Sequence, residues 1–249
     1  MPVDYLFTWL LIFLRAVGVV LLMPQMAGHA PPITVRLGLA ACVATLLVGL
    51  VPSAHLGPHW WDLASAAAGD VVLGLALGFV AQLAFSAVEL AGRIMSPEVG
   101  LSAAHGMSAP DLASEPLAAF LGAFAVVLFF LFGGQFAVLS AFARSFDFAP
   151  PGHAAFAAGT SDFIVRATGH VIELGLRLAA PFIALNFLVT LAFSVLGRAV
   201  PRMFVFVLSA PVRGMAGLAL LSGAGGLIAR YLFSEFSSLP RQMLQLVAH

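Results

Sequence analysis

The chain has 249 residues, of which 61% are hydrophobic and 9% are charged, and its basic and acidic side chains give no net charge. A soluble domain has about 25% charged residues. This composition, with a mean hydropathy of +1.06, therefore excludes an ordinary soluble protein. The zero net charge also excludes the basic surface by which proteins bind nucleic acids. We interpret the chain as an integral membrane protein.

Six stretches of the chain are apolar enough to cross a bilayer or nearly so, since a span takes about 20 residues. They are residues 5–23, 37–51, 71–91, 117–142, 178–196 and 203–233. The second is short, and the fourth and sixth are long and interrupted by glycines. Prolines lie in the joints between them, and proline ends or kinks a helix because it lacks a backbone donor and restricts the preceding residue. The sequence predicts an all-α membrane protein of about six hydrophobic helices in one domain, residues 1–249.

The joint at residues 96–116 is rich in proline, glycine and small side chains and carries little charge. A loop between two membrane helices ordinarily carries charge into bulk water. The composition is compatible with a plain surface connection, which it favours when taken alone, and also with a segment that packs inside a larger assembly. Its His105 has a side chain that titrates near neutral pH, and we interpret it as a partly packed polar residue.

Polar side chains share one face of several predicted helices. In the third, Glu89 precedes Arg93 by four residues, which is the favourable order for an ion pair on a helix. An isolated charge in hydrocarbon is costly, so such faces must contact protein, one another or water. They can pack within the chain, but their number in so short a chain favours burial against partner subunits. The polar residues in question are Arg15, Gln82, Glu89, Arg93, Asn186, Arg198 and Arg213.

Two further patterns carry less information. Gly74 and Gly78 have the spacing that lets two membrane helices approach closely, although this spacing is common in such helices. Arginines divide equally between the two sets of loops, so the positive-inside rule assigns no orientation.

The residue patterns of known catalytic and metal sites are missing from the sequence. There is no Gly-x-Ser-x-Gly, no P-loop, no His-Glu-x-x-His and no cysteine cluster. His55 and His59 are four residues apart, but Gly57 and Pro58 between them disfavour the helix that would bring the two imidazoles together. We expect no enzymatic activity, no cofactor and no metal.

Short motifs follow one another along nearly the entire chain in a specific order and spacing. They include Phe13-Leu14-Arg15-Ala16-Val17-Gly18, Gly74-Leu75-Ala76-Leu77-Gly78-Phe79, Gly100-Leu101-Ser102, Pro150-Pro151-Gly152, Ala180-Pro181 and Gly197-Arg198. Together they resemble the FliR family of flagellar export-gate proteins, whose injectisome counterparts form the SctT family. The central segment departs from that family, which often has a phenylalanine followed by Asp-Pro where this chain has residues 105–109.

The resemblance implies a non-enzymatic export-gate component of the flagellar type III protein export apparatus, multi-pass in the bacterial inner membrane at the flagellar basal body. Its helices would form hairpins within a hetero-oligomeric gate with FliP-like, FliQ-like and FlhB-like subunits, through which unfolded protein substrates pass. A subunit of an injectisome gate is the alternative. A small secondary transporter is less favoured, because its internal repeats are not visible here.

The resemblance also implies where the functional residues lie. A loop that closes the conduit would occupy the central segment, and its residues would be Gly100, Leu101, Ser102, His105, Gly106, Met107, Pro110, Asp111 and Pro116. The seven polar residues named above, from Arg15 to Arg213, would serve contacts within the membrane or between subunits rather than transport chemistry.

Overall fold

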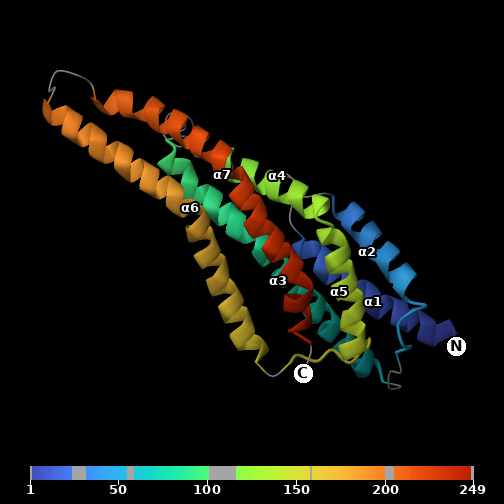
Figure 1. Ribbon diagram of the computed structural model, residues 1–249. Coiled ribbons are helices and arrows are strands. Elements are labelled where there is room, and N and C mark those ends of the chain that lie inside the picture. Colours follow the sequence, from blue (N-terminus) through green and yellow to red (C-terminus); the bar gives the residue numbers. More distant parts are fainter. Residues whose placement is uncertain are drawn as a thin grey trace. The chain divides into compact units, whose positions relative to one another are not determined.

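The computed structural model describes residues 2–23, 32–54, 59–100, 116–157, 159–199 and 205–247 (Figure 1). The regular structure in these ranges is helical, which confirms the predicted all-α class. The helices are α1 (Pro2–Leu22), α2 (Ile33–Leu47), α3 (Trp60–Glu98), α4 (Pro116–Leu131), α5 (Gly134–Phe148), α6 (Thr160–Ala199) and α7 (Val205–Leu244).

Four of these helices, α1, α3, α6 and α7, are long and apolar enough to cross a membrane. A fifth span results if α4 and α5 count as one bent element, with 69° between the two helices. The 15 residues of α2 extend about 22 Å at 1.5 Å per residue, which is short of the roughly 30 Å hydrocarbon core. The chain is a multi-pass membrane protein by these criteria.

The apolar stretch of residues 117–142 forms two helices, because the chain bends sharply after Leu131 at two of the glycines that interrupt it. Gly133 has φ +72, a left-handed conformation that glycine adopts without the clash that a β-carbon would cause. At Gly134 a β-carbon would lie 2.3 Å from the ring of Phe129. Gly133 and Gly134 therefore lie at the break between the two helices, whereas the glycines in the sixth apolar stretch lie within the continuous helix α7.

Three helices extend far beyond the apolar stretches that predicted them. α3 has 39 residues, and α6 and α7 have 40 each, which is about 60 Å at 1.5 Å per residue. That length is about twice the hydrocarbon thickness of a bilayer. Pro181, which stands inside the fifth apolar stretch, lies within α6 without ending it. The helices thus include polar turns that the sequence analysis placed in the joints between helices.

The contacts between α-carbons divide the chain into two compact units, and each of the long helices contributes to both. Unit 1 comprises Met1–Ala84, Phe129–Thr168 and Ser234–His249, and unit 2 comprises Phe85–Leu128 and Gly169–Phe233.

In unit 1 the backbones of α1 and α3 touch. A β-carbon at Gly74 would lie 2.2 Å from the carbonyl oxygen of Arg15, and one at Gly18 would lie 2.6 Å from the amide of Leu75. At Gly78 the nearest atom would be the carbonyl oxygen of Val19, at 2.9 Å. Small residues at a helix crossing permit such an approach. The glycine pair at 74 and 78 therefore marks a real helix contact.

In unit 2 the second half of α3 packs on α4, α6 and α7. Gly92 and Gly217 allow the closest approaches, to Ala118 of α4 and to Val99 respectively. The hairpin formed by α6 and α7 is nevertheless sparsely covered. Only 17% of the most apolar part of α6 and 11% of that of α7 are buried within the chain. Lipid or other subunits must cover the rest, because such apolar surface is unfavourable in water.

Candidate functional site

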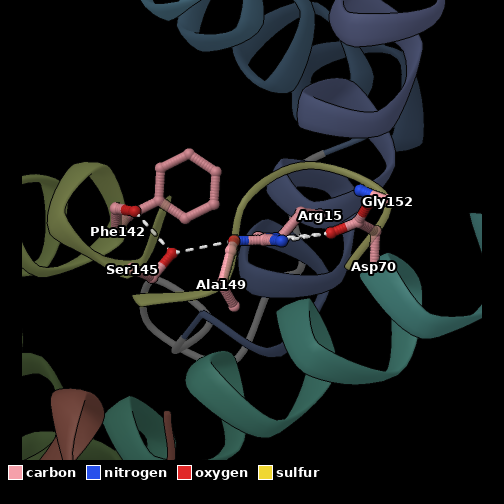
Figure 2. A network of polar contacts seen from close by, with 6 residues as sticks. All are labelled: Arg15, Asp70, Phe142, Ser145, Ala149 and Gly152. Atoms are coloured by element: carbon pink, nitrogen blue, oxygen red, sulfur yellow. Dashed lines mark hydrogen bonds and ion pairs between the residues drawn. The ribbon is translucent and has the colours of Figure 1, made fainter. Parts of the chain in front are cut away.

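A buried ion pair joins α1 to α3 in unit 1 (Figure 2). The side chains of Arg15 and Asp70 are both 0% exposed. Arg15 Nε donates to Asp70 Oδ1 at 2.8 Å, and Arg15 Nη2 contacts the same oxygen. Arg15 Nη1 donates to the Ser145 hydroxyl at 3.3 Å and to the Ala149 carbonyl at 3.0 Å. The guanidinium carbon also lies 4.1 Å from the centre of the Phe146 ring.

The second oxygen of Asp70 is held by the turn that follows α5. The Gly152 amide donates to Asp70 Oδ2 at 2.9 Å. Gly152 has φ +85 and stands directly after two prolines, which restrict the backbone of this turn. We call Arg15, Asp70, Ser145, Ala149 and Gly152 the Arg15 cluster. It joins α1, α3 and the carboxyl end of α5.

The Arg15 cluster leaves neither charge without a partner. All three guanidinium nitrogens of Arg15 and both carboxylate oxygens of Asp70 have hydrogen-bonding or ionic contacts within the chain. A buried pair costs desolvation free energy, and removing one member is strongly destabilising because the other charge remains buried. This arrangement is suited to hold helices in place, and the contacts of Arg15 are internal to the chain.

Asp70 is not among the functional residues predicted from the sequence, although the sequence contains a pattern that points to it. It is the only charged residue between Asp62 and Glu89 in the sequence. The third predicted apolar stretch begins at the next residue, Val71, and so leaves Asp70 out. A lone acid beside an apolar stretch calls for a basic partner, and Arg15 is a basic residue inside another apolar stretch.

A second group of polar side chains joins three helices in unit 2. Asn186 Nδ2 of α6 donates to Glu98 Oε2, at the end of α3, at 2.5 Å. The Thr190 hydroxyl donates to the Asn186 carbonyl at 2.7 Å, and Arg213 Nη2 of α7 donates to that hydroxyl at 3.1 Å. We call these four residues the Glu98 cluster. It brings together the predicted residues Asn186 and Arg213, whereas Glu98 and Thr190 were missed.

The predicted pair of Glu89 and Arg93 is confirmed, with Arg93 Nη2 and Glu89 Oε1 2.6 Å apart. The two side chains are 54% and 63% exposed. An exposed pair at this spacing stabilises a helix by about 0.3–0.5 kcal/mol. The ion pair therefore adds little to the stability of this chain on its own. Its predicted role at a subunit interface remains a prediction.

The remaining polar residues of the prediction lie apart from both clusters. Gln82 is half-buried on α3, where it interacts within the chain. Arg198 is exposed in the last turn of α6, a position where a basic side chain interacts favourably with the helix dipole.

Most of the predicted closure loop lies outside the described residues. This applies to Leu101, Ser102, His105, Gly106, Met107, Pro110 and Asp111. The two described members stand at its ends. Gly100 has φ +77 and its amide donates to the Pro97 carbonyl at 3.0 Å, which closes the carboxyl end of α3. Pro116 is the first residue of α4, where its missing N–H costs nothing.

The part of the chain that the structure describes contains no group of three or more histidine, cysteine, aspartate or glutamate side chains able to hold a metal ion. The charged groups of the Arg15 cluster are satisfied within that cluster. In the Glu98 cluster, the buried Arg213 Nε has no hydrogen-bond partner among the described residues. Both clusters connect helices.

The family described as bacterial export proteins, family 1, matches residues 6–239. The chain is 29% identical to the flagellar biosynthetic protein FliR of Escherichia coli (strain K12) over 230 residues, 91% of this chain and 88% of FliR. It is 26% identical to FliR of Bacillus subtilis (strain 168), over 98% of this chain and 97% of that protein. The Yop proteins translocation protein T of Yersinia pestis is 30% identical over 158 residues, 61% of this chain and 59% of that protein.

Proposed function

The chain belongs to the bacterial export proteins, family 1, and from this membership we propose that it is a non-enzymatic export-gate component of the flagellar type III protein export apparatus. The observation that carries the proposal is similarity to flagellar FliR proteins along nearly the whole chain, up to 98% of its length. The proposed location is the bacterial inner membrane, at the flagellar basal body. The proposed substrates are unfolded flagellar subunits.

An injectisome gate subunit is the second candidate. It is supported by the similarity to the Yop proteins translocation protein T, which covers 61% of this chain. The FliR proteins of Escherichia coli and Bacillus subtilis match 91% and 98% of this chain, and we therefore favour the flagellar system. A secondary transporter that uses Arg15 finds no support in the structure, since that guanidinium is fully engaged by the Arg15 cluster.

The proposed partners are FliP-like, FliQ-like and FlhB-like subunits. The sparse burial of α6 and α7 supports a partner at the hairpin, and so does their length of about 60 Å, which exceeds what a bilayer can cover. Large apolar side chains are exposed on both helices, among them Phe187, Leu188 and Val195 of α6 and Met215, Leu218 and Phe233 of α7. Glu89 and Arg93 on α3 would be covered by the same assembly.

We propose that the segment from Gly100 to Pro116 closes the resting conduit. This segment connects α3 to α4 and carries small residues and glycines, and glycine reaches backbone conformations closed to other residues. Its Met107 is a flexible apolar side chain that adapts to irregular surfaces. A closure must exclude ions at rest and yield to a passing chain, and such residues suit both requirements.

Deleting His105–Ala109 is expected to leave the gate assembled but leaky to ions and small molecules at rest, because the closure is shortened while its ends remain in place. Membrane conductance or dye uptake in cells that express the complete gate measures the leak. Co-purification with the FliP-like and FliQ-like subunits controls for assembly. An assembled deletion variant as tight as the wild type would refute the closure role of this segment.

A further inference from the structure

The charged side chains of the α6–α7 hairpin have an uneven distribution. No acidic residue lies between Glu173 and Glu235 in the sequence, whereas five arginines do. On α6, residues 178–197 carry no charge, and Arg177 and Arg198 flank them. These two arginines are about 31 Å apart at 1.5 Å per residue. Their separation matches the roughly 30 Å hydrocarbon thickness of a bilayer.

One contact fixes the register between the two helices of the hairpin. Arg213 Nη2 of α7 donates to the Thr190 hydroxyl of α6 at 3.1 Å. In unit 2, α6 and α7 run in opposite directions (Figure 1). Counting from this contact therefore places Arg230 within about one helical turn of the level of Arg177. Arg177 and Arg230 mark one end of the uncharged part of the hairpin, and Arg198 marks the other end.

The surface between these two levels is apolar and open. Phe187 is 65% exposed and its neighbour Leu188 is 62% exposed. Consecutive residues of a helix point about 100° apart, so α6 exposes apolar side chains on more than one face. A partner subunit on one face leaves another face uncovered. Such surface is unfavourable in water, and lipid is the surrounding that it fits.

Arg213 is the exception, because it lies between the two levels. Its contact residue Thr190 stands eight residues before Arg198, which is about 12 Å along the helix. The buried Nε of Arg213 has no hydrogen-bond partner among the described residues, so this guanidinium has lost part of its hydration. A charge at such a depth requires a polar or charged partner. Glu98 supplies a negative charge nearby, because Asn186 Nδ2 donates to Glu98 Oε2 and the Thr190 hydroxyl donates to the Asn186 carbonyl.

We propose that residues 178–197 of α6 and the facing turns of α7 lie in the hydrocarbon of the bilayer and contact lipid. Arg198 lies among anionic phospholipid headgroups at one end, where a basic side chain is attracted to the membrane surface. Arg177 and Arg230 lie in the headgroup region at the other end. The turns of α6 before Arg177 and of α7 after Arg230 lie outside the hydrocarbon.

Within this placement, Glu98 is a positioning residue. Its negative charge compensates that of Arg213, and Asn186 and Thr190 connect the two side chains by hydrogen bonds. The charges of the Glu98 cluster then sum to zero, which lowers the cost of holding Arg213 inside the hydrocarbon.

Spin labels on single cysteines test the contact with lipid. Leu188→Cys, Val195→Cys and Ile172→Cys are each made with Cys42→Ala, and the complex that co-purifies with the chain is reconstituted in vesicles of phosphatidylethanolamine and phosphatidylglycerol. Leu188 is close to the midpoint between the two levels, Val195 is nearer to one level, and the exposed Ile172 lies about 8 Å outside the hydrocarbon. Oxygen concentrates in hydrocarbon, whereas a water-soluble nickel chelate is excluded from it.

The ratio of oxygen to nickel accessibility is expected to be several-fold higher at position 188 than at position 172, with position 195 between them. A label at position 188 that the nickel chelate reaches would overturn the placement. A label there that neither reagent reaches would also overturn it, because a partner subunit would then cover this face. If Leu188→Cys does not assemble, the ratio at position 195 relative to that at position 172 decides the question in the same way.

Glu98→Gln tests the counter-charge, because it keeps a side-chain oxygen for Asn186 and removes only the charge. The accessibility ratio at position 188 is expected to fall several-fold as the hairpin shifts toward water, and adding Arg213→Gln is expected to restore it. Glu89→Gln, which removes an exposed acid from the same helix, is the control and should leave the ratio unchanged. The ratio is measured on each label, so a lower yield of complex does not alter it.

An unchanged ratio in Glu98→Gln would refute the counter-charge role and leave the contact with lipid standing. If Glu98→Gln does not assemble, the yield of the complex becomes the measured quantity. A double variant with Arg213→Gln that assembles then supports the compensation of charge, and a double variant that assembles no better than Glu98→Gln overturns it.

Discussion

Replacing Asp70 with alanine is expected to remove about 3–5 kcal/mol of stability, because it leaves the guanidinium of Arg15 buried without its counter-ion. The total stability of a typical protein is about 5–15 kcal/mol, so a loss of this size is a large part of it. The Gly152 amide also loses its acceptor. The steady-state amount of the chain in the membrane is expected to fall several-fold, which immunoblotting and pulse-chase labelling measure.

Two matched variants define the cause. Asp62→Ala removes an exposed acid from the first turn of the same helix and is expected to change the amount little. The double variant Arg15→Met with Asp70→Leu removes both charges, and replacing a buried pair with apolar side chains is often neutral or stabilising. It should therefore accumulate better than Asp70→Ala. The stabilising role of the Arg15 cluster would be contradicted if Asp70→Ala accumulated to the same amount as Asp62→Ala. It would also be contradicted if the double variant accumulated to a lower amount than Asp70→Ala.

Gly74→Ala is expected to destabilise the chain by about 1–3 kcal/mol or more, the range for overpacked cores. The added β-carbon would lie 2.2 Å from the Arg15 carbonyl oxygen, and a backbone atom cannot move aside as the end of a side chain can. α1 must shift away from α3, which also strains the ion pair of Arg15 with Asp70. The midpoint of thermal aggregation of the detergent-solubilised complex measures the effect.

Gly38→Ala in α2 is the control, because nothing lies within 4 Å of its added β-carbon. Alanine is favoured over glycine inside a helix by about 0.8–1.0 kcal/mol, so this variant should be unchanged or slightly more stable. The double variant Gly74→Ala with Asp70→Ala should lose less stability than the sum of the losses of the two single variants, since both substitutions act on the contact between α1 and α3. If Gly74→Ala behaves like Gly38→Ala, the close approach of α1 and α3 is not required.

Local patterns in the sequence predicted local structure well. The spacing of Glu89 and Arg93 predicted their ion pair, which needs only one helical turn to form. The apolar stretches located the helices because burial in lipid or protein requires about 20 such residues in succession. The bend at Gly133 is harder to predict from the sequence. A glycine in an apolar stretch can break the helix or lie inside it, and tertiary packing decides between the two outcomes.

The contacts that make the two clusters could not be predicted from local patterns. Arg15 and Asp70 are 55 residues apart in sequence, and Asn186 and Glu98 are 88 apart. Each polar residue of such a pair can form its hydrogen bonds with the same chain, with a partner subunit or with water. Composition does not distinguish these three possibilities. The sequence predicted that Arg15, Asn186 and Arg213 make contacts, and the structure supplies their partners within this chain.

The most direct test of the proposed function is the export of flagellar proteins by a strain that lacks this gene. Hook and filament subunits are measured in the culture medium and inside the cell. We expect that the strain synthesises early flagellar subunits but exports none, and that the wild-type gene restores export and motility whereas Asp70→Ala does not. Normal flagellar export in the deletion strain would contradict a role of this chain in the flagellar gate, and a loss confined to the substrates of an injectisome would favour the second candidate.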